Sequence, residues 1–537
     1  MAEFNIHRLS AYPFKYVLFV LGFGCVVLGW YHSYPVSIPP PGRFAFENIS
    51  VLVWPGLSLV LTSLYLISRS ASKKVAFLCA TVFVFFVFSY YLFFPLLPGP
   101  DAHTFRARAI LFSIVGADPA QNRYFQWPSF FVLNDVLTHI LGLDMDSVSV
   151  LVFVVTGFLL SCSLFLFFSA EDETLGFCGV ALYFVGLFWF LNYQFAPQSL
   201  ALGFFFVLVN LTSRRHRSIE VASLAVFTGL VFLHAFIAPL FILYYFILTL
   251  RDRTRLNSLV SYCVIYLGFL VYFAVYHFQS LLETLPALYY AFLEYGEYRD
   301  IVQRTFSSPV TIIDAVAQVF SRGTTISIWG MLGLGFLARV LKRDIRTVNL
   351  AMLFAGLSHL AIGLFLPVLG ARALQIVFVP FVSGYRVFVR RTKTIAAVCL
   401  ILVLILFPFN IIHQIYDAGS PTFLIETPSG ERASEALIKS LQTRNPGINL
   451  LSSDHDGSYI VNRLPSYFNI WSSTPPSVQL QILLSHKYDY VIYSPLLEKE
   501  LSYSGLGYPE IRQVRLQLLT ECNRVLDDGY SSILACG

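Results

Sequence analysis

The residues best placed for chemistry lie between Pro98 and Arg108, directly after a long apolar segment. Asp101 and His103 can accept or pass on a proton, and Arg106 can hold a phosphate through parallel hydrogen bonds. A carboxylate at the mouth of an apolar bundle is costly to desolvate, which favours a role for Asp101 as a general base. Structural roles are possible for the same two side chains. Asp101 is also a suitable N-cap for the amphipathic run that follows, and Arg106 also fits a surface arginine whose stem covers apolar groups.

Three further polar side chains stand where apolar segments are interrupted. Gln198 ends the polar stretch 192–198 and offers a neutral amide to a hydroxylated ligand, unless it serves as a helix cap. Arg372 is the only basic residue in the stretch 365–374, a place suited either to a lipid-linked phosphate or to an anchor at the membrane interface. His234 lies at a break between two short apolar segments, where it either lines a cavity or is a satisfied core histidine.

The sequence does not predict a metal or another cofactor. The motif Asp454-His-Asp-Gly457 has the residue types of a metal site, but an Asp- and Gly-rich turn explains it better. No paired CxxC zinc pattern, phosphate-binding P-loop or GxGxxG motif occurs. Six of the eight cysteines lie in apolar segments as packing residues, whereas Cys522 and Cys536 either pair in an oxidising compartment or stay free.

The amino-acid composition predicts the kind of element that positions these residues. The 537 residues are 56% hydrophobic and 12% charged, against about 25% charged in soluble chains, so the chain is not a soluble domain. About 20 apolar residues cross roughly 30 Å of hydrocarbon, and backbone facing lipid must be helical. The sequence predicts an all-α polytopic membrane bundle of about 13 transmembrane segments. These segments are Tyr16–Trp30, Val51–Ile67, Val75–Leu97, Val148–Phe168, Leu175–Leu191, Leu200–Leu211, Val221–Leu233, Phe236–Leu250, Leu259–Tyr276, Ile326–Leu337, Leu350–Leu369, Leu374–Val387 and Ile395–Phe407.

Basic residues set the expected orientation, because Lys and Arg near helix ends are retained in the cytoplasm. They cluster on alternate connections, so the net charge of +5 is a topology signal and no nucleic-acid partner is expected. The amino terminus is then cytoplasmic and the carboxyl end extracytoplasmic, in a multi-pass protein of the cell membrane. The acidic connection 170–174 is the one that gives no support. The predicted inner clusters lie at 8–15, 69–74, 214–217, 251–255, 339–346 and 386–393.

The stretch 221–250 allows two interpretations. One long tilted helix would place the clusters beginning at Arg214 and Arg251 on opposite sides of the membrane. Two short segments broken between His234 and Pro239 keep both clusters inside, and we expect this break.

The connections and the carboxyl end complete the predicted organisation. A transmembrane domain over 1–412 carries two long outer loops, 98–147 and 278–323, and the first loop should hold two helices on the membrane surface, at 104–115 and 130–143. A linker over 413–430 leads into a small extracytoplasmic α/β domain over 431–537. Its predicted helices are 431–442 and 476–485, and its predicted strands are 448–452, 488–493 and 531–535.

This arrangement resembles the GT-C superfamily of membrane glycosyltransferases, which includes the oligosaccharyltransferase catalytic subunit and the protein O-mannosyltransferases. Asp101 matches the acidic residue of the family's first outer loop if two additional helices precede the family's first. The stretch 192–198 corresponds to the second outer connection, 278–322 to the mobile outer loop, and Arg372 to the arginine that holds the lipid phosphate. The chain departs from the family in lacking a DxD motif in the second connection and a WWDYG-type motif in the terminal domain.

The resemblance implies a metal-independent transfer of a sugar from a polyprenyl-phosphate carrier to an acceptor hydroxyl at the outer membrane face. Asp101 would be the base of an inverting displacement, and Arg372, with Arg106, would stabilise the departing phosphate. His103, Gln198 and His234 would bind substrate. The implied partners are the lipid-linked sugar, membrane lipids, and a glycan or protein acceptor. The alternatives are a transporter or flippase of lipid-linked saccharides, a polysaccharide polymerase, or an inactive scaffold.

Overall fold

The computed structural model describes most of the helical part of the chain and the strands of its carboxyl end. The described residues are 12–33, 49–89, 105–106, 108–110, 112–113, 116–119, 123–187, 195–213, 217–234, 236–273, 312–363, 367–416, 450–452, 467–469, 490–493, 508–527 and 532–535.

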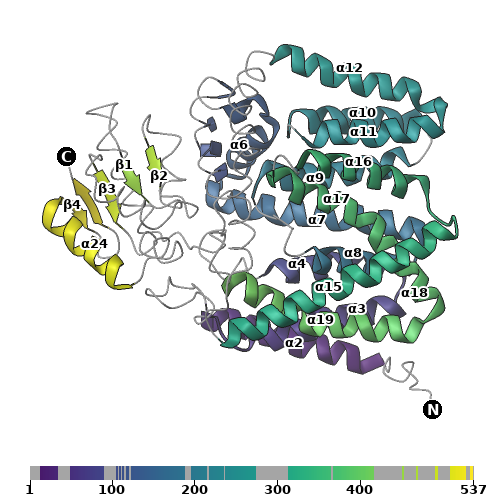
Figure 1. Ribbon diagram of the computed structural model, residues 1–537, viewed down its shortest axis with the longest axis horizontal. Helices are drawn as coiled ribbons and strands as arrows, with labels where there is room; N and C mark the ends of the chain where they lie inside the picture. The colour runs from purple at the N-terminus through teal and green to yellow at the C-terminus, as the bar shows by residue number, and fades with distance from the viewer. Residues whose placement is uncertain are drawn as a thin grey trace.

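A bundle of apolar helices forms the main body (Figure 1). Six stretches of 19 to 27 residues are long and apolar enough to cross a membrane, and shorter apolar helices pack among them. The polytopic membrane fold predicted from composition is therefore confirmed, whereas the predicted number of about 13 transmembrane segments stays a prediction. The helices are α2 (Tyr12–Ser33), α3 (Val53–Ser70), α4 (Lys73–Phe88), α6 (Ser129–Leu141), α7 (Met145–Glu171), α8 (Leu175–Gly186), α9 (Pro197–Thr212), α10 (Arg217–Val231), α11 (Ile237–Arg251), α12 (Leu256–Tyr272), α15 (Ile312–Leu341), α16 (Thr347–Gly363), α17 (Pro367–Ser383), α18 (Tyr385–Arg391) and α19 (Lys393–Tyr416).

Helix α6 in the first long connection has the pattern of a helix on the membrane surface. Its buried side chains include Phe130 and Phe131, whereas Val132, Val136 and Ile140 are exposed four residues apart. An apolar stripe that is left exposed next to a membrane bundle fits a helix lying at the lipid interface. A short 3-10 helix, η3 (Arg123–Gln126), precedes α6.

The break expected between 234 and 239 is present. Helix α10 ends at Val231 and α11 begins at Ile237, and each has 15 residues. Arg255 Nη1 donates a hydrogen bond of 2.7 Å to the carbonyl oxygen of Thr212, so the connection after α11 lies next to the end of α9. Thr212, which lies just before the cluster 214–217 in sequence, and the cluster 251–255 therefore lie at the same end of the bundle, as the broken-helix interpretation requires.

A close backbone contact fixes the long helix α15 against the turn between α17 and α18. A Cβ atom on Gly335 would stand 2.4 Å from the carbonyl oxygen of Gly384, so neither helix could approach this closely with a larger residue there. Helix α15 begins at Ile312 rather than at the expected Ile326, and it carries Arg322 within its length.

The carboxyl end contains a mixed sheet, which confirms the predicted α/β unit. Strands β1 (Leu450–Ser452), β3 (Tyr490–Tyr493) and β5 (Ser532–Ala535) match the expected strands, whereas β2 (Tyr467–Asn469), β4 (Asn523–Asp527) and α24 (Tyr508–Glu521) were not anticipated. The strand order is β2-β1-β3-β5-β4. The pairs β1–β2 and β1–β3 are parallel and the other two pairs are antiparallel. The expected helices 431–442 and 476–485 lie outside the described residues.

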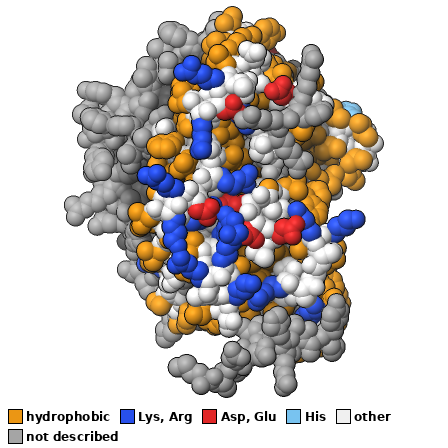
Figure 2. Space-filling view, turned by 90° about the vertical axis from the view of Figure 1, so that its right-hand side faces the viewer, with side chains coloured by type: hydrophobic (Ala, Val, Ile, Leu, Met, Phe, Trp, Pro, Cys, Tyr) orange, Lys and Arg blue, Asp and Glu red, His pale blue; other side chains and the backbone are white. Residues whose placement is uncertain are grey.

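Charged side chains gather at one end of the bundle. Lys and Arg side chains gather, with Asp and Glu among them, on the face that lies to the right in Figure 1, next to α18 (Figure 2). Helix α6 is drawn on the other side, toward the sheet. We call the face next to α18 the basic end, and the end that carries η3 and α6 the α6 end.

Candidate functional site

Chain segments that are far apart in sequence meet at the α6 end. The backbone N–H of Ser129 donates a hydrogen bond of 3.1 Å to the carbonyl oxygen of Phe232, which joins the start of α6 to the turn between α10 and α11. The rings of Phe130 and Phe195 lie 4.9 Å apart, which joins α6 to the start of α9. These contacts bring the segments of Gln198 and His234 to one end of the bundle. The rings of Phe105 and Phe130 lie 6.1 Å apart, which adds the segment of Arg106.

The end of α16 and the first turns of α17 lie at the same end. The rings of Phe236 and His359 are 6.5 Å apart, so the end of α16 lies near the α10–α11 turn. Helix α17 packs on α16, because a Cβ on Gly356 would be 3.5 Å from the carbonyl oxygen of Ala373. Arg372 directly precedes Ala373 in α17. The structure describes its backbone but not its side chain.

Arg106 is buried and paired. Its side chain is 4% exposed, and its Nη1 donates a hydrogen bond of 2.7 Å to Oδ1 of Asp146, which is in the first turn of α7. Asp144 caps the same helix, since its Oδ1 accepts a 2.7 Å hydrogen bond from Ser147 N–H. That hydrogen bond, with the nearby Arg106 charge in support, lowers the pKa of Asp144 below its ordinary value. The start of α7 is thus held to the segment that follows Asp101.

The two remaining described site residues differ in their surroundings. Gln198 is 8% exposed in the first turn of α9, and its Nε2 has no hydrogen-bond partner in the structure as described. His234 is half-buried, and its Nδ1 accepts a long hydrogen bond of 3.3 Å from the backbone N–H of Phe236. Asp101 and His103 lie outside the described residues. The structure therefore leaves their predicted roles as predictions.

Two buried amides at the α6 end were not predicted from the sequence. Gln126, at the end of η3, is 0% exposed, and neither its Oε1 nor its Nε2 has a hydrogen-bond partner within the described structure. Asn134 in α6 is also 0% exposed. Its Nδ2 donates to the carbonyl oxygen of Phe130 at 2.7 Å, while its Oδ1 has no partner there. Neutral amides within an apolar and aromatic sequence give no motif, so the sequence offered no signal for either residue.

Aromatic side chains surround the segment of Gln126. The ring of Phe125 lies 5.2 Å from that of Phe131 and 5.2 Å from that of Phe112, in edge-to-face contacts. The guanidinium of Arg108 lies 3.9 Å from the ring centre of Tyr124, a close cation–π contact. The α6 end thus combines an aromatic core with a few polar groups, which is the usual composition of a small-molecule site.

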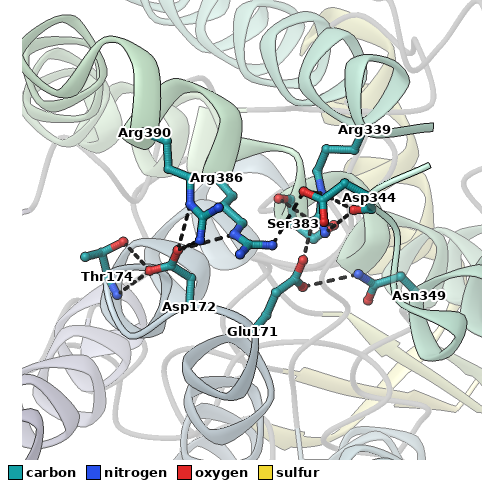
Figure 3. A network of polar contacts seen from close by, with 9 residues as sticks. All are labelled: Glu171, Asp172, Thr174, Arg339, Asp344, Asn349, Ser383, Arg386 and Arg390. Atoms are coloured by element: carbon teal, nitrogen blue, oxygen red, sulfur yellow. Dashed lines mark hydrogen bonds and ion pairs between the residues drawn. The ribbon is translucent and has the colours of Figure 1, made fainter. Parts of the chain in front are cut away.

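The basic end carries a different kind of cluster, an ion-pair network between four connections (Figure 3). Arg339 of α15 pairs with Glu171 at the end of α7, and both side chains are almost fully buried. Asn349 Nδ2 donates to Glu171 at 3.2 Å, and Arg339 Nη1 donates to the carbonyl oxygen of Ser383 at 3.0 Å. Every charged group in this core has a partner, so these residues have a structural role. We call the group of Glu171, Arg339, Asn349 and Ser383 the clasp.

The rim of the network explains the acidic connection 170–174. Asp172 pairs with Arg386 at 3.3 Å and with Arg390 at 3.2 Å, so the acidic connection is the partner of the basic ones and lies on the same side. Burial acts to raise the pKa of Asp172, but hydrogen bonds from Thr174 and the two arginines outweigh it and leave the pKa below the ordinary value. This acidic connection is therefore consistent with the predicted topology.

Metal-ligating side chains do not cluster within the part of the chain that the structure describes. No group of three or more His, Cys, Asp or Glu residues there is arranged to hold a metal ion. The motif Asp454–Gly457 lies outside the described residues. Cys522 is disulfide-bonded, and the six cysteines of the helical segments are free.

Comparison with known proteins gives similarity in structure but none in sequence. No protein-family model and no curated protein matches the chain. Among solved structures, ArnT from Cupriavidus metallidurans bound to undecaprenyl phosphate is similar at 13% identity and a TM-score of 0.44, over 87% of this chain and 99% of that one. The apo form of the same protein is similar at 11% identity and a TM-score of 0.43, over 87% and 98%. These TM-scores fix no correspondence between residues, and they assign no activity to this chain.

Proposed function

We propose that this chain is a membrane glycosyltransferase that moves a sugar from a polyprenyl-phosphate carrier to an acceptor hydroxyl. The observation that carries the proposal is the convergence at the α6 end of the segments of Arg106, Gln198 and His234 and of the first turns of α17. These residues are spread over more than 250 positions of sequence, and they meet beside an aromatic core. Arg106 also limits the position of Asp101, since five residues reach at most about 18 Å.

The proposed reaction is a single inverting displacement. The acceptor oxygen attacks the anomeric carbon, and the bond from that carbon to the phosphate oxygen breaks. Asp101 takes the acceptor proton, and the electron pair leaves with the polyprenyl phosphate, whose charge Arg372 stabilises with support from Arg106. Arg106 already pairs with Asp146, which offsets much of its charge, so its support is small and Arg372 is the main phosphate ligand.

We also propose that the α6 end faces the extracytoplasmic side. The disulfide at Cys522 supports this orientation, because disulfides persist in oxidising compartments. The direction of α19 supports it as well. This helix begins at Lys393, two residues after α18 on the basic end, and leads toward the carboxyl-terminal domain. The proposed partner of Cys522 is Cys536.

A direct assay tests the function and the two key residues. The full chain in lipid nanodiscs is supplied with undecaprenyl phosphate carrying radiolabelled mannose or glucose, together with a mixture of membrane glycan acceptors. We expect transfer by the parent, a loss of about 10²- to 10⁴-fold in Asp101→Asn, and weaker donor binding in Arg372→Ala. Asp135→Asn is the matched control. This carboxylate lies in the same connection and pairs with His139 of its own helix, so its removal should leave transfer unchanged.

Two results would contradict the proposal at different levels. Parent-like turnover by a folded Asp101→Asn variant would remove the base assignment but not the function. Movement of labelled lipid across a vesicle membrane without transfer would instead favour the transporter alternative.

A further inference from the structure

Gln126 stands out because its buried amide is unsatisfied. A buried amide without a hydrogen bond is destabilising, and roughly nine in ten or more buried polar groups in native proteins have a partner. Gln126 is 0% exposed, and both atoms of its amide lack a partner throughout the described structure. Packing alone does not account for an amide here, because methionine would fill a similar volume without the cost. A group that the protein itself leaves unsatisfied is suited to a ligand.

The position of Gln126 points to the same end of the bundle as the proposed reaction. It ends η3 and lies three residues before Ser129, whose N–H bonds to Phe232 in the α10–α11 turn. The next helix contacts the start of α9 through Phe130 and Phe195. Gln198, three residues after Phe195, carries a second unpartnered amide nitrogen, and it is 8% exposed. Two amides with free hydrogen-bonding capacity therefore lie on segments that touch.

The chemistry of this surface favours a sugar ring. An amide offers two donors and two acceptor positions, which match the vicinal hydroxyls of a sugar, and carries no charge that would compete for the phosphate. The rings of Phe125 and its neighbours supply apolar faces beside it. Sites that combine aromatic walls with a few fixed polar groups gain orientation from the polar groups. A phosphate would instead call for Arg or Lys at this position.

We propose that Gln126, with Gln198 in support, hydrogen-bonds the sugar hydroxyls of the lipid-linked donor. The inference rests on the proposed function and names the part of the site that recognises the sugar. The amide of Gln126 is fully enclosed, so it suits a substrate that stays bound. The lipid-linked donor stays bound while the acceptor enters from water, and the donor is therefore the better ligand for Gln126. Because Gln126 is enclosed, the segment around η3 must open to admit the donor and close over it.

Thermal unfolding with two ligands tests this role. The full chain in nanodiscs is heated alone, with undecaprenyl phosphate, and with undecaprenyl phosphate carrying mannose or glucose. For the parent we expect a rise in the unfolding midpoint with the bare lipid phosphate and a larger rise with one of the glycosylated lipids. In Gln126→Met the two rises should become equal, with donor affinity about tenfold lower. Without ligand, this variant should unfold about 1–3 °C higher than the parent, because it no longer buries an unsatisfied amide.

The control and a second variant make the outcome unambiguous. Thr62→Val in α3 also removes a buried, unpartnered polar atom, so it should keep both ligand-induced rises. Gln126→Leu repeats the test with a different side-chain shape if Gln126→Met fails to fold. A variant of Gln126 that is less stable than the parent yet keeps the extra rise from the sugar would overturn the inference and show a structural amide. A parent that responds to none of the lipids would count against the proposed function itself.

Discussion

Arg106 shows how a charged residue at the candidate site is supported by its neighbours. Its guanidinium is buried, whereas the side chain of its partner Asp146 is 46% exposed. The pair therefore joins a buried cation to a carboxylate that still contacts water. Such a pair fixes the geometry at the start of α7 at a smaller desolvation cost than a fully buried one.

Removing the carboxylate of Asp146 alone should lower the stability of the fold. We expect Asp146→Asn to lower the free energy of unfolding by about 1–2 kcal/mol, since Arg106 then stays buried with a weaker partner while solvent screening limits the loss. Urea unfolding of the purified chain measures this. Asp135→Asn is again a suitable reference, because its partner His139 is 72% exposed and a pair open to solvent on one side should contribute little. Equal stability of both variants would mean that the 2.7 Å contact between Arg106 and Asp146 is not stabilising.

At the same scale, the sequence drew attention to Arg106 and Gln198 but not to Gln126 and Asn134. Arg106 was recognisable because a charge beside an apolar run must have a partner or a function. Gln198 was recognisable because it interrupts an apolar run. Gln126 and Asn134 were missed, since an amide is common in loops and its importance depends on burial, which only the packed structure reveals.

At the scale of elements, the clasp at the basic end joins four helices. Glu171 accepts from Arg339 and Asn349, and Arg339 also donates to Ser383, so α7, α15, α16 and α17 meet at one buried ion pair. Helix α17 is the helix that carries Arg372 at its other end. The clasp and the close contact of Gly335 with Gly384 therefore set the direction in which α17 points toward the candidate site.

Breaking one half of this pair should cost far more than replacing both halves. We expect Glu171→Gln to lower the free energy of unfolding by about 3–5 kcal/mol, because it leaves the buried Arg339 with only the exposed carboxylate of Asp344, 3.8 Å away, as a counter-charge. The double variant Glu171→Met with Arg339→Met should recover most of that loss. Thermal unfolding in detergent, run as a double-mutant cycle, gives the coupling energy between the two side chains. Additive losses would show that the two charges act independently, against the clasp.

Helix positions were largely predictable, and their ends and partners were not. Each predicted apolar segment contains a helix, because length and apolar composition suffice to specify one in a membrane. The break after Val231 followed from the basic residues on both sides. The earlier start of α15 at Ile312 was missed, since Arg322 and the polar residues near it suggested a loop although they are compatible with a helix end that leaves the apolar region. The acidic connection 170–174 could not be explained until its arginine partners were known.

At the scale of the whole molecule, charge separates the two ends of the bundle. Basic connections and their acidic partners share one face (Figure 2), whereas the aromatic core and the buried amides lie at the end with α6. The positive-inside rule predicts that the basic face is cytoplasmic.

Accessibility labelling tests this orientation. In a chain with its free helical cysteines replaced, we expect an impermeant maleimide to label His139→Cys in intact cells and Lys342→Cys only after permeabilisation. Both positions are exposed, so accessibility depends on the side of the membrane alone. Oxidised Cys522 should resist the reagent until a reductant is added. Labelling of Lys342→Cys in intact cells would invert the topology and place the candidate site inside.

The hairpin of α10 and α11 has a consequence for the surrounding lipid. Each helix has 15 residues and so measures about 22 Å, against roughly 30 Å of hydrocarbon in an ordinary bilayer. A bilayer meets such hydrophobic mismatch by thinning locally. The turn at His234 lies at the end of this hairpin, so such thinning would bring the headgroup layer closer to the midplane beside it. A long isoprenoid anchored there would hold its head at the level of the turn, without being lifted out of the membrane.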